Sequence, residues 1–558
     1  MPTSTRPARS PRIGAATLSK QSDPRSLVQR ILDTPDLPQA LPRLAPELLH
    51  QVIQRCGLEA CGELLALATP AQLERVADLD LWRSAKPGLD EQFDTGRFEV
   101  WIEALLECGA DVAARTLTAF DATLVSAGLT PHVRVFDVAA VSPYVTTDGE
   151  QVAVRSEFGK ELALEIAGYR IVATRADVSW DAIVEVLQAL AGEYGDYFHR
   201  VMRGCRTLSS GGRELDGLDN LLTDSGQTLY DLASGREARR ESRGFLAPSE
   251  ARAFLQASRK VRLDAKSAPA IDPIARAYFR LASEAAAGAG TSDRTLPAAD
   301  PGSVPLADDA ATAVAALTSV LAESGLVTGS PRILLDAPGA ARLGRIHAHL
   351  QQVLEEDAVA HAGQIAELGY LANALMAGCS ILSRPFTAPE AWDAAVAVCN
   401  LGLENWPNRW PLGQAQGPER VDRALVTAFQ VGWTVLYDEV CLRAAGDLIV
   451  VLNGVRVADR ETQTGLNALR RLLTRRVRAG TPWQAREAMD VLATLDIVAW
   501  TALLGLLDEC PVIHAALRAS LASSPHTIDP DAFEFVSENA QIASVRAFLD
   551  ALPATLGP

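Results

Sequence analysis

The apolar positions of this chain recur mainly at the three- and four-residue spacings of amphipathic helices. Between residues 48 and 58 the leucine, valine and isoleucine positions follow one helix face, which Gly57 is expected to end. Thr69 is expected to cap a further helix whose first residue is Pro70. Short helices joined by proline- or glycine-marked turns therefore dominate the beginning of the chain.

Longer helices are predicted over 95–108 and 110–125, with Gly109 between them. Helical hairpins that repeat in this way indicate an array in which neighbouring units bury each other's apolar faces. An array of this kind is the predicted architecture of the N-terminal half.

The spacing changes to two between residues 133 and 178, where apolar and polar positions alternate around a turn at 167–168. Alternation of this kind predicts a small β-hairpin or a sheet of two or three strands. Helical spacing returns over 181–201, whereas residues 204–243 are polar and interrupted by glycines, so no element is predicted within them. A short helix is expected after Pro248.

Composition changes most clearly at residues 283–305, which are mostly Ala, Gly, Ser, Asp and Pro. Such a segment buries too little apolar surface to order itself, so a domain boundary is expected there. The following stretch contains six of the nine tryptophans, which suits a thick helical core. Its predicted helices lie near 308–324, 340–362, 364–378, 388–402, 418–444, 462–479, 484–508 and 530–551.

The charge of the chain limits the classes of molecule that it is expected to bind. The formal net charge is −17, although residues 1–30 carry six basic side chains against one acidic side chain. An acidic body argues against nucleic-acid binding, which needs a basic surface. No apolar run is typical of a signal peptide or a membrane span, so we expect a soluble, acidic protein with no integral membrane segment.

Cysteine usage and motif content say little about chemistry. The eight cysteines are scattered without a CxxC pair, as expected of a reduced, cytoplasmic protein. No Walker A loop, dinucleotide glycine fingerprint, GxSxG elbow, HExxH or kinase motif set is present. The sequence therefore indicates no cofactor, no catalytic residue and no metal-ligand set, and it favours a protein without catalytic activity while leaving the question open.

Six stretches along the chain together carry a resemblance to a known family: Leu41–His50, Leu65–Leu73, Asp78–Trp82, Asp90–Asp94, Tyr197–Cys205 and Ala395–Glu404. In these stretches the sequence resembles a bacterial family known only as a domain of unknown function, and the resemblance extends over most of the chain. Such a family implies no activity.

The repeated Leu-Pro and Thr-Pro hairpins also look like the cytosolic N-terminal domain of MgtE-type magnesium transporters. That resemblance implies a right-handed helical array, which in the transporters regulates an attached membrane channel, but no membrane domain follows here. We therefore predict a mainly α fold: an N-terminal right-handed helical-hairpin array with a small β-hairpin insert, followed by a C-terminal all-helical domain. The predicted limits are a disordered basic tail at 1–22, the array at 23–262 with its insert at about 133–178, a linker at 263–307 and the C-terminal domain at 308–558.

An acidic loop between two predicted helices is the first candidate binding site. Clustered carboxylates could hold a hard cation such as Mg²⁺. A simpler interpretation is that these acids cap helix N-termini and favour the positive end of the helix dipole. The residues concerned are Asp78, Asp80, Arg83, Asp90, Glu91 and Asp94.

Histidine-containing groups give weaker candidates. His199 and Arg203, with Cys205 close by, are one helical turn apart and could bind an anion or supply a general base, although basic residues also suit the last turn of a helix. His347 and His349 cannot share one ion on a continuous helix, because they point about 200° apart. The spacing of His50, Cys56 and Cys61 matches no zinc pattern.

A basic stripe on the predicted helix near 466–478 is the last candidate site. Four arginines fall within about 140° of the helix circumference, opposite a leucine-rich face. The stripe could bind an acidic partner, an anionic lipid surface or nucleic acid, but internal ion pairing is the simpler expectation in an acidic protein. The arginines are Arg470, Arg471, Arg475 and Arg478.

These observations lead to three hypotheses about function. The leading one is a cytoplasmic protein-interaction or regulatory scaffold without catalytic activity, because helical arrays expose long grooves. The first alternative is an enzyme or small-ligand-binding protein with its pocket between the two domains. The second is a weak Mg²⁺-responsive regulatory protein, based on the transporter-like array and the loop carboxylates. A protein partner is expected, and the oligomeric state is left open.

Overall fold

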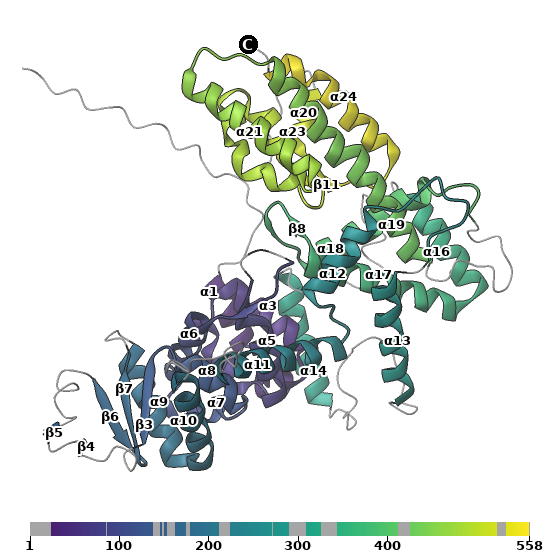
Figure 1. Cartoon of the computed structure of the whole chain (residues 1–558). Coiled ribbons are helices and arrows are strands. Elements are labelled where there is room, and N and C mark those ends of the chain that lie inside the picture. Colours follow the sequence, from purple (N-terminus) through teal and green to yellow (C-terminus); the bar gives the residue numbers. More distant parts are fainter. Residues whose placement is uncertain are drawn as a thin grey trace, which may run out of the picture. The chain divides into compact units, whose positions relative to one another are not determined.

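The structure of the chain is a computed structural model (Figure 1), in which a mainly α fold carries small sheets of two or three strands, as predicted. The predicted tail at 1–22 lies outside the described residues, as do residues 289–307 of the predicted linker, and the right-handed sense of the array stays a prediction. The described residues are 24–84, 86, 88–137, 145–147, 150–152, 162–174, 179–210, 224–270, 272–288, 308–324, 343–410, 424–521 and 532–556.

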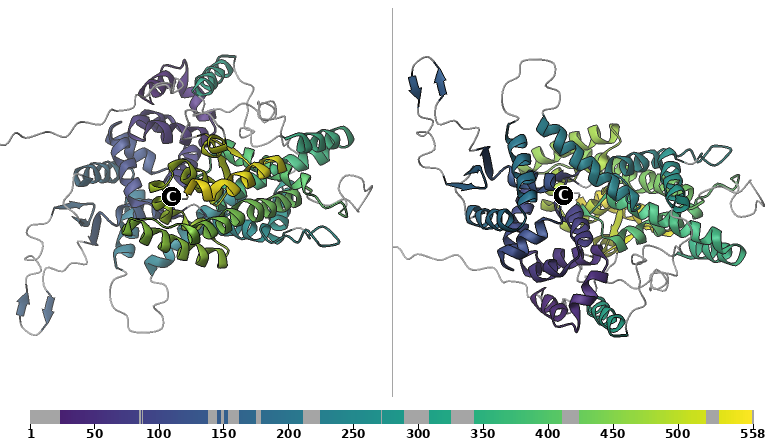
Figure 2. Two further views of the ribbon diagram at one scale, coloured as in Figure 1. Left: turned by 90° about the horizontal axis from the view of Figure 1, so that it is seen from above. Right: turned by 90° about the horizontal axis from the view of Figure 1, so that it is seen from below.

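The chain divides into two compact units, and neither is one continuous stretch of sequence. The first consists of Met1–Trp82, Phe93–Leu232 and Arg294–Thr328, and the second of Arg83–Gln92, Ala233–Asp293 and Gly329–Pro558. Helix α14 (Asp308–Glu323) packs against α2 in the first unit, as both views of Figure 2 show. The predicted domains were continuous stretches, so their limits differ from those of the compact units.

Short helices make up most of the first unit, and their caps follow the predicted chemistry. Thr69 and Gln72 form a capping box at the start of α5, and Gly57 (φ 88°) ends α3. The helices are α1 (Pro24–Leu32), α2 (Leu37–Ala40), η1 (Leu41–Arg43), α3 (Pro46–Cys56), η2 (Glu59–Cys61), α4 (Gly62–Leu67), α5 (Pro70–Asp80), α6 (Thr95–Leu106), α7 (Ala110–Leu117), α8 (Ala122–Leu129), α9 (Ser179–Glu193) and α10 (Gly195–Ser210), followed by α11 (Asp224–Ser242), which continues into the second unit.

Three predictions for this region are wrong. The helix expected over 110–125 breaks before α8, where the Asp121 carboxylate accepts a hydrogen bond from the Thr123 amide. The helix expected over 181–201 breaks at Tyr194, between α9 and α10. The polar stretch to which no element was assigned contains the end of α10 and all of α11.

The predicted β insert is confirmed. Strand β7 (Tyr169–Ala173) lies between β3 (Val133–Asp137) and β6 (Ala163–Ile166), and both pairs are antiparallel. The two-residue turn before β7 has positive φ at both Ala167 and Gly168, which matches the twist of a tight hairpin. Two further strands, β4 (Val145–Thr147) and β5 (Glu150–Val152), pair with each other.

One continuous hydrophobic core runs through the second unit. Two departures from regular α-helix occur in it: a π-helical segment, η6, joins α19 to α20, and a 3-10 helix, η7, replaces the first half of the helix predicted over 484–508. The elements are β1 (Trp82–Arg83) and β2 (Gln92–Phe93), which flank the 83–92 segment, then α12 (Pro248–Ser258), α13 (Pro273–Gly288), α16 (Gly344–Glu356), α17 (Ala358–Gly378), β8 (Ser380–Ile381), β9 (Arg384–Pro385), α18 (Ala388–Glu404), α19 (Ala424–Leu436), η6 (Tyr437–Leu442), α20 (Arg443–Gly454), α21 (Arg460–Arg478), η7 (Pro482–Thr494), α22 (Ile497–Leu506), β10 (Val512–His514), α23 (Ala515–Leu521), β11 (Phe533–Phe535) and α24 (Asn539–Leu556).

No helix in the described part of the chain combines the length and the apolar run that a membrane span needs. All eight cysteines are free thiols, and Cys61 is fully buried. Burial of this kind is typical of a cysteine that packs as a small apolar group.

The backbones of α18 and α19 approach each other closely at two glycines. A Cβ atom added at Gly402 would lie 1.7 Å from the carbonyl oxygen of Ala428, and one added at Gly432 would lie 2.0 Å from that of Val398. Both obstacles are backbone atoms, which cannot move aside without shifting a helix. Glycine is therefore required at both positions by packing.

We expect Gly402→Ala to lower the free energy of unfolding by about 3 kcal/mol, because the methyl group has to push α18 and α19 apart. Urea denaturation followed by circular dichroism measures the change. The matched control is Gly363→Ala in α17, where an added Cβ meets nothing within 4 Å. That substitution should raise stability by about 0.5–1 kcal/mol, since alanine is the better helix former. Equal effects of the two substitutions would contradict this account of the packing.

Candidate functional site

The acidic loop that the sequence suggested as a cation site does not gather its carboxylates in one place. Asp78 and Asp80 are buried at the end of α5, whereas Arg83 and Asp90 are exposed. Asp94 caps α6 by accepting a hydrogen bond of 3.0 Å from the Arg97 amide. Among the described residues, no group of three or more His, Cys, Asp or Glu side chains is arranged to hold a metal ion.

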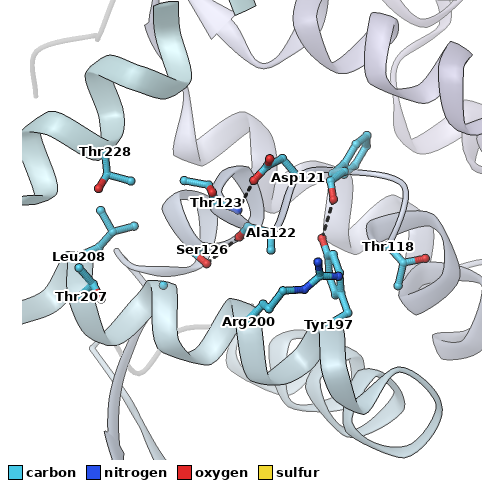
Figure 3. Close-up of a pocket in the computed structure, with 12 residues that line it drawn as sticks. Thr118, Asp121, Ala122, Thr123, Ser126, Tyr197, Arg200, Thr207, Leu208 and Thr228 are labelled. Atoms are coloured by element: carbon cyan, nitrogen blue, oxygen red, sulfur yellow. Dashed lines mark hydrogen bonds between the residues drawn. The ribbon is translucent and has the colours of Figure 1, made fainter. Parts of the chain in front are cut away.

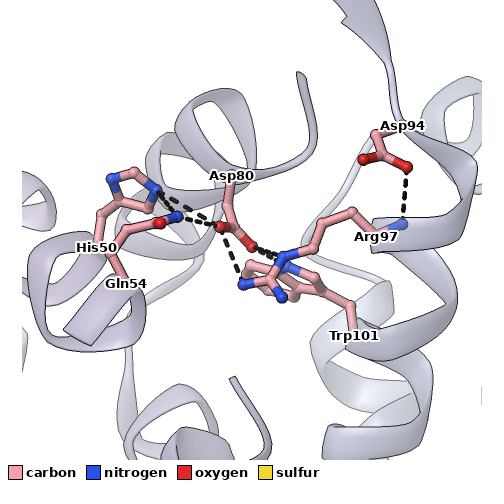
Figure 4. A network of polar contacts seen from close by, with 6 residues as sticks. All are labelled: His50, Gln54, Asp80, Asp94, Arg97 and Trp101. Atoms are coloured by element: carbon pink, nitrogen blue, oxygen red, sulfur yellow. Dashed lines mark hydrogen bonds and ion pairs between the residues drawn. The ribbon is translucent and has the colours of Figure 1, made fainter. Parts of the chain in front are cut away.

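Asp80 is the centre of a buried polar network in the first unit (Figure 4). Its side chain is 1% exposed and accepts hydrogen bonds from the Arg97 guanidinium (2.8 and 3.1 Å), the Trp101 indole (2.7 Å) and the Gln54 amide (2.9 Å). The Nε2 atom of His50 lies 3.5 Å from the same carboxylate. These contacts join α3, α5 and α6 and leave the carboxylate no open face for a cation.

Electrostatics confirm that Asp80 is held as an anion. Burial alone would raise the pKa of its carboxyl group, but hydrogen bonds from His50, Arg97 and Trp101 outweigh burial and hold the pKa well below its usual range. A carboxylate stabilised in this way contributes to folding above the pKa of the unfolded chain and loses that contribution as the pH falls. The role that this geometry supports is structural.

Glu91 is also occupied by the protein's own cations. Its carboxylate lies 2.6 Å from the Arg236 guanidinium and 2.7 Å from that of Arg240, both on α11. The Arg236 side chain is only 2% exposed, so its charge depends on this pairing. Glu91 therefore ties the 83–92 segment to α11 within the second unit.

His199 and Arg203 lie on the exposed side of α10, and His199 is near the start of that helix rather than in its last turn, where it was expected. The Arg203 Nε atom donates to the carbonyl oxygen of His199 at 3.2 Å, and the His199 ring packs 5.6 Å from that of Tyr169. Burial raises the pKa of the nearby Cys205 thiol to about 12, so that the group stays protonated. These contacts show a packed helix surface without a base poised over a cavity.

A cavity of about 560 Å³ lies beside this helix in the first unit (Figure 3). Several hydroxyl groups line it, but they bond to the backbone: the Tyr197 hydroxyl donates to Leu117 (2.7 Å) and Phe120 (3.0 Å), and that of Ser126 lies 2.7 Å from the Ala122 carbonyl. The Arg200 guanidinium lies 5.5 Å from the Tyr197 ring centre. No histidine lines the cavity, so its hydroxyls have no adjacent imidazole to activate them.

The predicted basic stripe lies on one face of α21, and the internal ion pairs expected for it do not occur within the described residues. Arg470 donates a hydrogen bond of 2.8 Å to the Asn453 side chain. Arg471, Arg475 and Arg478 are exposed, and no carboxylate of the described residues pairs with them. Leu466, Leu469 and Leu473 are buried on the opposite side of the helix.

Sequence reasoning missed a second cavity, which lies inside the second unit and is lined by Arg259, Thr481, Trp483 and Asp508. One signal in the sequence could have indicated it. Asp508 and Glu509 directly follow the most apolar stretch of the chain, so the backbone holds them close to the interior, where a carboxylate needs partners. The arginine and the tryptophan lie more than two hundred residues apart, so no local pattern joins them.

We expect Asp80→Asn to lower the free energy of unfolding by about 3 kcal/mol at pH 7, because it leaves the Arg97 charge without its partner. Since the pKa of Asp80 is lowered in the folded protein, the difference from the wild type should narrow as the pH falls from about 5 to about 3. Thermal unfolding at several pH values measures both effects. The matched control is Asp90→Asn at an exposed position. A loss of stability in Asp80→Asn that does not change with pH would contradict the role given to the Asp80 charge.

Comparison with known proteins identifies a similar family, but that family has no known function. Residues 12–206 match the model of a family of unknown function (DUF6178). This match contains Tyr197–Cys205 but not Ala395–Glu404, so the expected resemblance is confirmed over the N-terminal part only. No curated protein and no solved structure matches the chain, and the similarity to the MgtE N-terminal domain is not supported. Over residues 12–206, then, the chain is similar to the family of unknown function DUF6178.

Proposed function

We propose that the protein is an interaction or regulatory protein that binds an acidic segment of a protein partner through the exposed arginines of α21. The observation that carries this proposal is that Arg471, Arg475 and Arg478 have no carboxylate partner among the described residues, although the chain has 69 acidic residues against 52 basic ones. An acidic chain offers many partners for a surface arginine. Three open neighbours on one face are therefore a distinctive surface feature.

The geometry of the stripe suits an extended acidic ligand. The three arginines fall within about 60° of the circumference of α21 and cover about 10 Å of its length. Like charges at this spacing repel one another, which costs a few tenths of a kcal/mol per pair in the free protein. The helix dipole accounts for cations in the last turn only, and Arg471 lies two turns from the end. An acidic ligand would relieve the repulsion.

A protein partner is favoured over nucleic acid by the charge of the whole molecule. A net charge of −17 repels a polyanion at long range, whereas a short acidic segment meets only the local field of the stripe. The Mg²⁺-responsive alternative has less support, because Asp80, Glu91 and Asp94 are occupied by donors of the protein itself. The alternative of a ligand pocket between domains stays a prediction.

The test is fluorescence anisotropy with a labelled glutamate-rich peptide. We expect measurable binding that weakens as salt rises from 0.05 to about 0.3 M, because exposed charges are screened over about 10 Å at 0.1 M. The triple variant Arg471→Gln, Arg475→Gln, Arg478→Gln should bind about tenfold more weakly, at about 0.5 kcal/mol for each exposed pair.

A charge-matched control removes three exposed arginines from other elements, through Arg115→Gln, Arg134→Gln and Arg345→Gln. This control should bind nearly as well as the wild type if the α21 face is the site. Equal losses in the two triple variants would show a net-charge effect and defeat the proposal. Parallel titrations with duplex DNA and phosphatidylserine vesicles decide the occupant, since tighter binding of either one through the same arginines would replace the acidic protein segment.

A further inference from the structure

The second cavity, of about 560 Å³, is built entirely from residues of the second unit. The end of α12, the β8–β9 turn, the start of η7 and the residues after α22 all contribute side chains to it. Leu255 and Trp483 supply apolar surface, while arginine, serine and threonine side chains supply hydrogen-bonding groups. The size of the cavity and its mixture of apolar and polar lining residues are typical of a site for a small organic molecule.

Arg259 is the polar group of this cavity that stands out. Its guanidinium carbon lies 4.0 Å from the ring centre of Trp483 and 5.0 Å from that of Tyr437. Aromatic rings stabilise a cation through its faces and leave its N–H edges available. No described acceptor takes a hydrogen bond from this guanidinium, and its Nε atom is buried. A second donor, the Thr481 hydroxyl, is buried in the same wall and also lacks a partner.

The three carboxylates that line the cavity, by contrast, are already occupied. Glu487, the most exposed of them, pairs with Lys86 at 3.0 Å. Asp508 pairs with Arg486 at 2.5 Å and accepts a hydrogen bond from the Leu382 amide. Glu509 accepts hydrogen bonds of 3.1 Å from both the amide and the hydroxyl of Ser380. Burial also raises the pKa of Asp508 to about 6, even though Arg486 acts against it, which weakens its demand for a further cation. Among the charged groups that line the cavity, the one left without a hydrogen-bond or ion-pair partner in the described structure is therefore a donor, the Arg259 guanidinium.

A strained turn contributes to the same cavity. Ser383, one of the lining residues, and Leu382 form the two-residue β8–β9 hairpin turn, and both lie in the left-handed region (φ 64° and 48°), which costs energy in residues other than glycine. The π-helical segment η6 begins at Tyr437, whose ring stacks on the Arg259 guanidinium. Strained turns and π segments both occur often at functional sites.

We propose that this cavity binds a small organic oxyanion, a ligand that carries a carboxylate or a phosphate group, through the Arg259 guanidinium and the Thr481 hydroxyl. The planar guanidinium edge matches two oxygens of either group, and the adjacent apolar wall accommodates the rest of the ligand. This inference is independent of the acidic partner proposed for α21, because it uses a different set of residues.

Isothermal titration of the full chain with phenyl phosphate, benzoate and inorganic phosphate tests the proposal. We expect the better of the two organic anions to bind with a Kd of about 0.1–1 mM, and inorganic phosphate to bind more weakly because it leaves the apolar wall empty. Arg259→Gln should weaken that binding at least about tenfold. Arg200→Gln is the matched control, since Arg200 also stacks on a tyrosine but lies in the first unit.

The titrations with phenyl phosphate and benzoate identify the charged group of the ligand. Tighter binding of phenyl phosphate indicates a phosphate, and tighter binding of benzoate indicates a carboxylate. Absence of binding by all three anions at about 10 mM overturns the proposal, as does binding that Arg259→Gln leaves unchanged or that Arg200→Gln weakens equally.

If Arg259→Gln fails to fold, the variant Thr481→Val tests the proposal in its place. It removes a hydroxyl that has no partner in the described structure, so the fold should tolerate it while affinity falls several-fold. Unchanged affinity in that variant would also overturn the proposal.

Discussion

The second unit depends on the close contact of α18 and α19, which only glycine at Gly402 and Gly432 permits. This contact fixes the position of α19, and α19 fixes its neighbours in turn. The hydroxyl of Thr434 on α19 donates to the Ser258 carbonyl at 2.7 Å and so holds the end of α12. Arg259 is the next residue, and Tyr437 follows Thr434 by one helical turn. The packing of two helices therefore fixes the positions of the Arg259 cation and of one of the rings that stack on it.

Signals contained within a few residues predicted the fold well, and signals that depend on distant contacts did not. The helix cap at Thr69 and the turn at Ala167–Gly168 need only their own neighbours, and both were predicted correctly. Helix breaks at Asp121 and Asp357 were missed because the apolar spacing continues through them, although an aspartate that caps the next helix marks each one. The π segment leaves no mark in the periodicity, since it arises from packing.

The same distinction between local signals and distant contacts applies to the candidate sites. Helical geometry alone places the arginines of α21 on one face, so the stripe was predictable from spacing. Whether a charge is paired depends on the whole chain: Asp80 meets Arg97 on the next long helix, and Glu91 meets Arg240 from 149 positions away. The acidic loop therefore resembled a cation site in the sequence, while Asp80, Glu91 and Asp94 are bound to donors of the protein itself in the fold. The stripe was expected to be paired, and three of its four arginines have no carboxylate partner in the part of the chain that the structure describes.

In a chain with an excess of carboxylates, an arginine without an acidic partner is more informative than one with such a partner. On α21 the open charges face water, so leaving them unpaired costs little stability and leaves them available to a partner. Arg259 is half-buried, where an unpaired charge is expensive. The rings of Trp483 and Tyr437 offset part of that cost through the faces of the guanidinium, without using its N–H groups. A carboxylate in their place would stabilise the charge equally well but would occupy the donors. Stabilising the cation with aromatic rings thus preserves the donors that an oxyanion needs.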